Sequence, residues 1–276
     1  MEWNGLWGLA YGLISGIFEL MPASPQTHQL LLQKITGLPA PGYGMALAVH
    51  LGVLAAILLS YYPILGKYSK EWKLHKQPRR NRARQPDAAT LMEYKLLKIA
   101  SVPVFLSCLF AGWLSRYFQR LWVLALIVIL NGVVVFLPHY MSRANKDARS
   151  MSPLDSTLIG WGGMLGVIPG MSRIGIFTAV SSMRGLDAQF GLKFAFLLLI
   201  PALLGSCVGD IGMLLSGNTA NSISFLAVIL ACVAAFGAAM VIIRLMRFLS
   251  VKGSYEGFAY YNWGLGMFTF IIYLIG

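Results

Sequence analysis

Long apolar stretches broken by two short polar islands constrain this chain more than any other feature. The islands are Glu19–His28 (ELMPASPQTH) and Pro169–Arg173 (PGMSR). Each lies inside a stretch apolar enough to enter a bilayer, and each carries ionisable groups at that depth. Broken helices and charges are tolerated there only where protein or a water-filled cavity surrounds them. We therefore expect the islands to face one another across a buried polar site, and Arg173 favours an anion as its ligand.

The composition is that of a membrane protein with several crossings. Of the 276 residues, 57% are hydrophobic and 12% are charged, which is about half the charged fraction of soluble domains. The mean hydropathy is +0.68. Three cysteines lie in apolar stretches without the spacing of a metal site, and we expect them to be packing residues. They are Cys108, Cys207 and Cys232.

The apolar stretches predict an all-α polytopic membrane protein with six transmembrane helices plus two re-entrant helical hairpins. A crossing needs about 20 apolar residues, and six segments are long enough. The six are 43–66, 96–116, 120–138, 190–214, 223–246 and 258–276. Two further stretches, 5–36 and 157–183, are broken by the islands. Each is expected to enter the membrane and return on the same side.

Positive charge predicts how the segments are oriented. The net charge is +12, and ten of the 22 basic residues lie between Lys67 and Lys98. Basic loops between spans usually face the cytoplasm, so loops 67–95 and 140–152 are expected there. This placement argues against a nucleic-acid partner. The hairpins then open from opposite faces, which predicts one membrane domain built as an inverted repeat. Its halves are 1–139 and 153–276, joined by the loop 140–152.

The second island has the residues of an anion site. Pro169 ends one helix and Gly170 permits a tight turn. Ser172 is suited to cap a new helix, whose first N–H groups favour phosphate or carboxylate. Arg173 adds a forked donor that can bind two phosphate oxygens. The alternative is a structural kink in which this arginine pairs with a buried carboxylate.

The first island supplies complementary groups. Glu19 could hold a divalent cation, act as a base, or neutralise Arg173. His28 could be a nucleophile or a general acid, or a hydrogen-bonded packing residue. Three further residues offer hydroxyl and amide contacts to a phosphate: Ser24, Gln26 and Thr27.

Two ionisable residues inside long spans are secondary candidates. His50 and Asp210 could line the same cavity, because ionisable groups at this depth face the protein interior. The alternative is a structural hydrogen bond between helices. The sequence leaves this choice open.

At these residues the sequence resembles the bacterial undecaprenyl pyrophosphate phosphatase family, also known for bacitracin resistance. The segment from Glu19 to His28 is similar to the family's Glu-Phe-Leu-Pro-x-Ser-Ser-x-x-His element. Pro169-Gly-x-Ser-Arg173 is similar to its Pro-Gly-x-Ser-Arg-Ser element. The resemblance implies six spans and two re-entrant hairpins in the bacterial inner (plasma) membrane. It also implies removal of one phosphate from the C55 polyprenyl pyrophosphate carrier at the outer face, with Mg or Ca, so that the carrier is reused in cell-wall synthesis.

Carried over by residue, the resemblance makes Glu19 a metal or acid/base carboxylate and His28 a catalytic imidazole. Ser172 and Arg173 would hold the pyrophosphate, with Gly170 shaping the turn between them and Pro169. Several family positions are replaced, however: Ser15 stands for a glutamate, Pro25 for a serine, Gln26 for a threonine, Ile174 for a serine and Gly163 for a glutamine.

These replacements leave alternative functions open. A metal-assisted hydrolase benefits from two carboxylates, and the first island keeps only Glu19. Phosphate binding needs only the helix start, Arg173 and a hydroxyl. The nominal expectation is therefore a phosphatase. The main alternative is a degenerate homologue that binds and translocates (flips) polyprenyl phosphate, and a third possibility is a structural membrane subunit.

Overall fold

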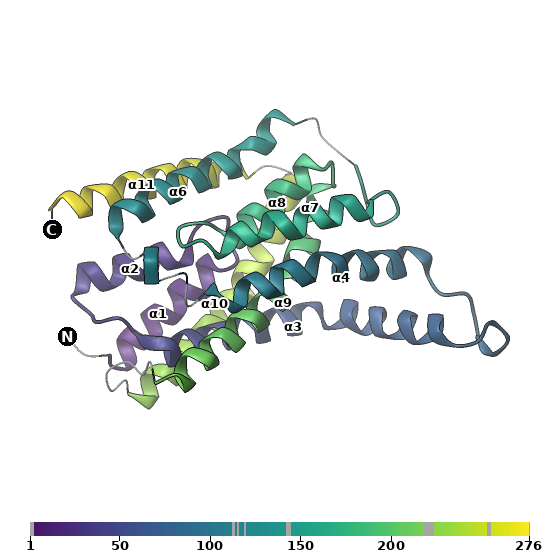
Figure 1. The fold of residues 1–276 in the computed structure, drawn as a ribbon, viewed down its shortest axis with the longest axis horizontal. Coiled ribbons are helices and arrows are strands. Elements are labelled where there is room, and N and C mark those ends of the chain that lie inside the picture. Colours follow the sequence, from purple (N-terminus) through teal and green to yellow (C-terminus); the bar gives the residue numbers. More distant parts are fainter. Residues whose placement is uncertain are drawn as a thin grey trace.

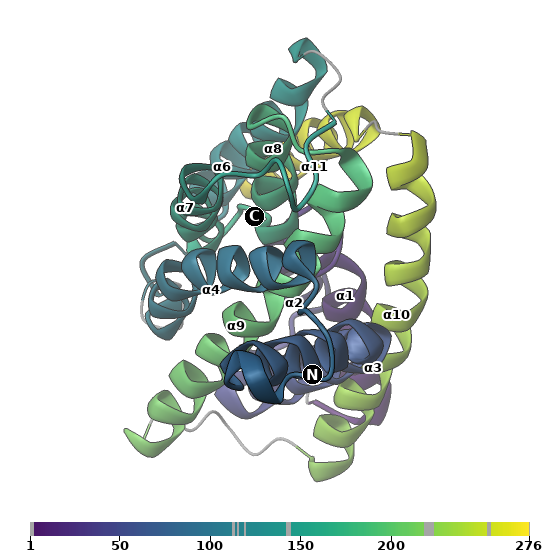
Figure 2. The same cartoon turned by 90° about the vertical axis from the view of Figure 1, so that its right-hand side faces the viewer.

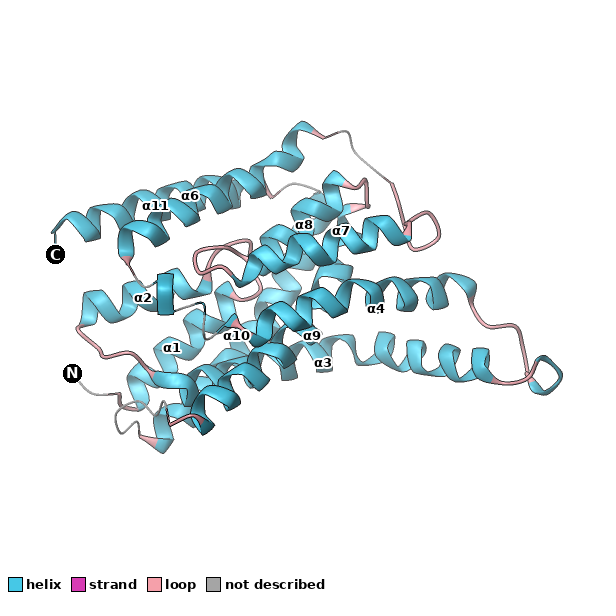
Figure 3. Ribbon diagram, in the orientation of Figure 1, coloured by secondary structure: helices cyan, strands magenta, loops and turns pink. Residues whose placement is uncertain are grey.

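The computed structural model describes residues 3–111, 114, 116–118, 120–141, 145–217, 224–252 and 255–275. Within these ranges the chain forms helices joined by turns (Figures 1 and 3). The strand-like pairing in the described part is one isolated bridge between Lys146 and Leu186. The fold is therefore all-α, as the apolar stretches predict.

Five helices in the described part of the chain are long and apolar enough to cross a membrane. They are α3 (Gly42–Lys76), α6 (Leu121–Phe136) with the 3-10 turn η3 (Leu137–Tyr140), α9 (Ala188–Leu215), α10 (Phe225–Lys252) and α11 (Glu256–Ile275). The chain is thus a multi-pass membrane protein. The sixth expected span, 96–116, begins inside α4 (Ala88–Leu109). Its end lies partly outside the described residues.

The two islands separate short helices that pack as hairpins. The first hairpin is α1 (Gly5–Phe18) and α2 (Pro25–Thr36); the second is α7 (Pro153–Met164), the 3-10 turn η4 (Leu165–Val167) and α8 (Arg173–Met183). The four α-helices have 11 to 14 residues. At 1.5 Å per residue each is about 17–21 Å long, shorter than a hydrocarbon core of about 30 Å.

Six helices pack in a row, in the order α1, α10, α3, α9, α4, α7, each contacting the next. A second group lies beside the row: α6 and α11 pack along one another, and α8 contacts α6. Figures 1 and 2 show the α6–α11 pair along one side of the bundle. α9 is the most enclosed of the five long helices, and it contacts α8, so it connects the two groups.

Glycines spaced four residues apart let α1 approach the backbone of α10. A Cβ added at Gly12 would lie 2.7 Å from Ala231 Cα and would also meet the Ala231 carbonyl oxygen. Small residues at this spacing are the usual means of close helix contact in membranes. The same contact repeats one turn to either side: Gly8 with Ala227, and Gly16 with Ala235.

The expected loop 67–95 is wrong in its extent, because α3 continues to Lys76 and α4 begins at Ala88. Only 77–87 lie between the two helices, which form a long arm (Figure 1). The expected loop 140–152 is described except for 142–144.

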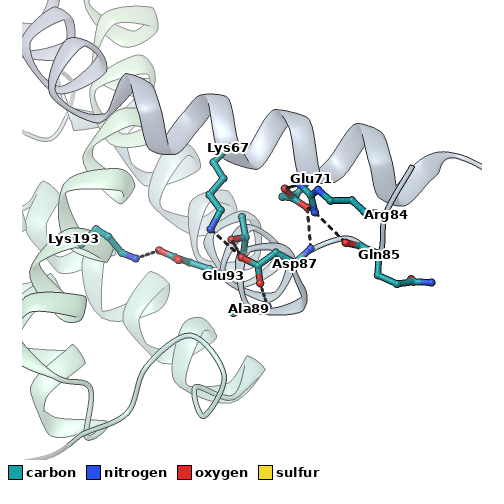
Figure 4. Close-up of polar contacts among 9 residues, drawn as sticks. Lys67, Glu71, Arg84, Gln85, Asp87, Ala89, Glu93 and Lys193 are labelled. Atoms are coloured by element: carbon teal, nitrogen blue, oxygen red, sulfur yellow. Dashed lines mark hydrogen bonds and ion pairs between the residues drawn. The ribbon is translucent and has the colours of Figure 1, made fainter. Parts of the chain in front are cut away.

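Polar contacts within this arm hold its two helices together. Glu71 on α3 is buried and pairs with Arg84, and the Asp87 N–H donates to Glu71 Oε2 at 2.9 Å. Lys67 Nζ lies 2.9 Å from Asp87 Oδ2. Figure 4 shows these side chains converging between α3 and the start of α4. The density of charge in the sequence predicts a loop here, whereas the acidic side chains of Glu71 and Asp87 form hydrogen bonds and ion pairs that hold α3 against the start of α4.

Candidate functional site

The islands meet through a buried ion pair. Arg173, the first residue of α8, donates from Nη1 to Glu19 Oε1 at 2.8 Å, and the two side chains are only 9% and 8% exposed. Glu19 follows the last residue of α1. The breaks in the two hairpins thus place a guanidinium and a carboxylate in direct contact across 154 residues of sequence.

Ser172 connects the two islands, which form the tips of the two hairpins. Its Oγ accepts from the Gly175 N–H at 3.0 Å, which caps α8, and donates to the Met21 carbonyl at 2.8 Å. Gly170 precedes it with φ at +99°, and a Cβ there would lie 2.7 Å from Ile127. That conformation favours glycine. The Ser172 hydroxyl thus both caps α8 and binds the first island.

Two buried amides that sequence reasoning missed hold both tips. Asn131 on α6 accepts the Ser172 N–H at 2.9 Å and donates to Asn262 Oδ1 at 2.9 Å. Asn262 on α11 donates to the Pro22 carbonyl at 2.7 Å. Both side chains are fully buried. The available signal was an isolated asparagine in each of two apolar helices, because a buried amide there needs partners.

His28 lies on the first turn of α2 with both ring nitrogens occupied. Nδ1 is 2.6 Å from the Ser24 carbonyl and Nε2 is 2.6 Å from the Tyr261 hydroxyl. A carbonyl only accepts, so Nδ1 carries the proton, and Nε2 of the neutral ring accepts from Tyr261. The ring stacks on Phe18 with centroids 3.4 Å apart. Its nitrogens therefore bond to neither Glu19 nor Arg173 in the described part of the chain.

The other polar residues of the first island support the start of α2. Ser24 Oγ accepts from the Thr27 N–H at 3.3 Å and from Thr27 Oγ1 at 3.1 Å. Both residues are fully buried. Gln26 is half-buried. The two hydroxyls serve as a helix cap here, as Ser172 does for α8.

Asp210 is a second carboxylate near the ion pair. Arg173 donates from Nη2 to Ser206 Oγ at 2.9 Å, and Asp210 lies one turn further along α9. Asp210 also interacts electrostatically with Arg173. Its Oδ2 is 2.8 Å from Nδ1 of His50 on α3. The secondary candidates thus form a pair that borders the ion-pair cluster.

The positions where the chain departs from the resemblance have structural partners of their own. Ser15 donates to the Tyr11 carbonyl at 2.7 Å and accepts from Gln29 at 2.9 Å. Ile174 is fully buried. Gly163 leaves room for the ring of Phe177, whose Cδ1 would lie 2.9 Å from an added Cβ. Pro25 begins α2.

The oxygen donors fit a cation that is shared with a phosphate ligand. Among the described residues, no three or more His, Cys, Asp or Glu side chains gather as a metal cage. Magnesium, however, often binds through one or two carboxylates together with substrate phosphates and water. Glu19 is the carboxylate that contacts Arg173. The arrangement therefore suits a cation that arrives with the ligand.

Comparisons with known proteins cover nearly the whole chain. The family model described as bacitracin resistance protein BacA matches residues 8–268. The protein named undecaprenyl-diphosphatase from Carboxydothermus hydrogenoformans is 30% identical over 99% of each chain. The protein of that name from Renibacterium salmoninarum is 28% identical over 99% of this chain and 96% of its own. The one from Methanobrevibacter smithii is 28% identical over 94% of each.

Proposed function

Because this chain belongs to the family of the bacitracin resistance protein BacA, we propose that it is an undecaprenyl-diphosphatase. Its substrate would be a polyprenyl pyrophosphate in the membrane, and its product the monophosphate used again as a lipid carrier. The buried contact between Arg173 and Glu19 at the meeting point of the tips carries the proposal. The names of the relatives favour hydrolysis over translocation of the lipid.

The pyrophosphate would bind by taking the place of Glu19 at the guanidinium. Arg173 is charged at all relevant pH values and its fork matches two phosphate oxygens. In the present state that fork is held by Glu19 and Ser206, so it is oriented before the ligand arrives. The start of α8 adds the partial positive charge of a helix N-terminus.

His28 would act as the base. Its Nδ1–H is fixed on the Ser24 carbonyl, which leaves Nε2 as the basic nitrogen once Tyr261 moves away. We propose that water attacks the terminal phosphorus and that its proton passes to Nε2. The bond from that phosphorus to the bridging oxygen breaks, which releases inorganic phosphate and leaves the polyprenyl monophosphate. Arg173 would offset the charge that develops on the bridging oxygen.

Glu19, released from Arg173, would hold a magnesium or calcium ion together with the pyrophosphate oxygens. When bound, such an ion supplies charge neutralisation to the phosphates. The rest of the donor set, Ser24, Gln26 and Thr27, would contact the phosphates only after rearrangement, because Ser24 and Thr27 are buried in the cap of α2.

An apolar groove would receive the isoprenoid chain. It lies between α1 and α10, and its lining includes Leu9, Leu13, Leu230 and Val233. α1 runs from this groove directly to Glu19. The groove and the ion pair would thus serve the tail and the head of one lipid.

The packing order supports the proposed inverted repeat of 1–139 and 153–276. If each helix of the row is exchanged for its counterpart in the other half (α1 with α7, α3 with α9, α4 with α10), the same order results, read from the other end. In addition, α6 packs against its counterpart α11. Both hairpins also begin their second helix with a serine cap, Ser24 and Ser172. We propose that the hairpins are re-entrant, that the connection 77–87 with the adjoining helix ends and the loop 140–152 are cytoplasmic, and that the site serves the outer face of the bacterial inner membrane.

Phosphate release from undecaprenyl pyrophosphate in detergent, with magnesium or calcium added, tests the function. We expect release by the unaltered protein and its loss in His28→Ala and Glu19→Ala. His139→Ala is the matched control, because His139 is an exposed histidine that pairs with Glu256; it should keep full activity. An unaltered protein that releases no phosphate, or a His28→Ala variant as active as the control, would contradict the proposal.

A further inference from the structure

Polar contacts continue from the ion pair into the helix pair α3–α9. Arg173 donates to Ser206 on α9 at 2.9 Å. Asp210 lies four residues later, and side chains at this spacing share a helix face. Asp210 Oδ2 then meets His50 Nδ1 on α3 at 2.8 Å. A chain of polar groups thus connects Glu19 to His50 through four helices.

This cluster is short of positive charge. Glu19 and Asp210 are both buried carboxylates, and one guanidinium, Arg173, interacts with both. Tyr11 lies within electrostatic range of the same two carboxylates. With His50 neutral, two negative charges face one positive charge. An unpaired charge is costly at membrane depth, so the cluster is poised to gain a proton.

The surrounding groups leave His50 as the group that can supply the missing charge. Near neutral pH a tyrosine and the cysteine thiols are uncharged and arginine keeps its proton. The side chain of His50 is 20% exposed and that of Asp210 is 7% exposed, so the imidazole is the more accessible member of the pair. The groups within electrostatic range of Asp210 are Tyr11 on α1, Arg173 on α8 and Cys207 on α9. Glu19 and Cys108 lie within range of Arg173, and the backbone of Cys232 on α10 packs against α3 at Gly52.

We propose that the His50–Asp210 pair takes up one proton when a diphosphate headgroup binds at Arg173. In the absence of a divalent cation, the headgroup brings at least two negative charges into a cluster that is already negative, and protonation of His50 offsets one of them. The proton is taken up from the solvent and stays on the imidazole while the headgroup is bound. This inference rests on the proposed function, because it assigns the headgroup to Arg173.

Proton uptake on binding can be counted by calorimetry. The probe is a polyprenyl methylenediphosphonate, in which carbon replaces the bridging oxygen so that hydrolysis cannot occur. Titrations in buffers of different ionisation enthalpy, from pH 6 to pH 9, give the protons taken up for each probe bound. We expect the unaltered protein to take up about one proton more than His50→Asn, and its Kd to rise about tenfold per pH unit where His50 is neutral before binding.

His50→Asn keeps an N–H donor beside Asp210 but cannot be protonated. The matched control is His139→Asn, because His139 also places Nδ1 beside a carboxylate, 2.6 Å from Glu256, but far along the chain from the site. The control variant should take up the same number of protons for each probe bound as the unaltered protein. Asp210→Asn is the second variant and should also lose the uptake, so a folding defect in one variant does not decide the outcome.

Two results would overturn the inference. If His50→Asn and Asp210→Asn take up as many protons as the unaltered protein, the pair does not titrate with binding, although the proposed function stands. If the probe does not bind, or binds equally well to Arg173→Ala, both the inference and the proposed function are wrong.

Discussion

Replacement of Gly12 by alanine tests whether close backbone packing of α1 on α10 positions the site. The added Cβ would lie 2.7 Å from Ala231 Cα, where ordinary contact begins at 3.4 Å. The two helices must therefore separate by at least about 0.7 Å, because the Ala231 carbonyl oxygen would lie closer still, and overpacking of this kind costs about 1–3 kcal/mol. Since Glu19 directly follows α1, the same movement strains its 2.8 Å contact with Arg173.

The control for this prediction is Gly264→Ala on α11, where an added Cβ meets nothing within 4 Å. Alanine favours a helix over glycine by up to about 1 kcal/mol, so this variant should be equally or more stable. Thermal unfolding in one detergent compares the two, and phosphate release is measured on the same samples. We expect Gly12→Ala to unfold at a lower temperature and to lose activity. A Gly12→Ala protein as stable and as active as Gly264→Ala would refute the reasoning.

Three further perturbations have expected outcomes. Asn131→Leu leaves buried partners without hydrogen bonds and should cost about 1–3 kcal/mol, read as a lower unfolding temperature. Glu19→Gln leaves the buried guanidinium without its charge partner and should cost about 3–5 kcal/mol, measured by denaturant unfolding in mixed micelles. Hydrogen bonds from Thr90 and Lys67 hold the pKa of Asp87 below its ordinary value. The ionised side chain therefore stabilises the arm formed by α3 and α4 at any pH above the ordinary carboxyl range. This stabilisation is lost only as the pH falls through the lowered pKa. Protease cleavage within 77–87 should stay slow down to about pH 4 and become fast at neutral pH in Asp87→Asn; equal cleavage of both proteins would contradict this.

The sequence predicts the local features of the fold well. Prolines mark where each hairpin breaks, and Gly170 and Ser172 mark the turn and the helix cap of the second island, because these residues act on the backbone of their own segment. The cost of burying charge at membrane depth likewise makes the meeting of Glu19 and Arg173 predictable. One alternative kept open from the sequence, an arginine paired with a buried carboxylate, describes the present state.

Contacts between distant segments are where the sequence fails. His28 binds Tyr261, which lies 233 residues away, and no local pattern links the two. Asn131 and Asn262 are likewise single asparagines in apolar helices on opposite halves of the chain. The extent of α3 was missed because charge along its last turns resembles a loop, although Glu71 turns inward and is buried.

The bond between Asn131 and Asn262 has a consequence for how the site would open. Both amides also hold backbone groups of the tips, at Pro22 and at Ser172. If α6 and α11 tilted together as one rigid body, the two tips would therefore move with them and keep their spacing. A sliding of α6 against α11 would instead pull them apart. Admission of a lipid headgroup would then be governed by two helices that contribute no charge to it.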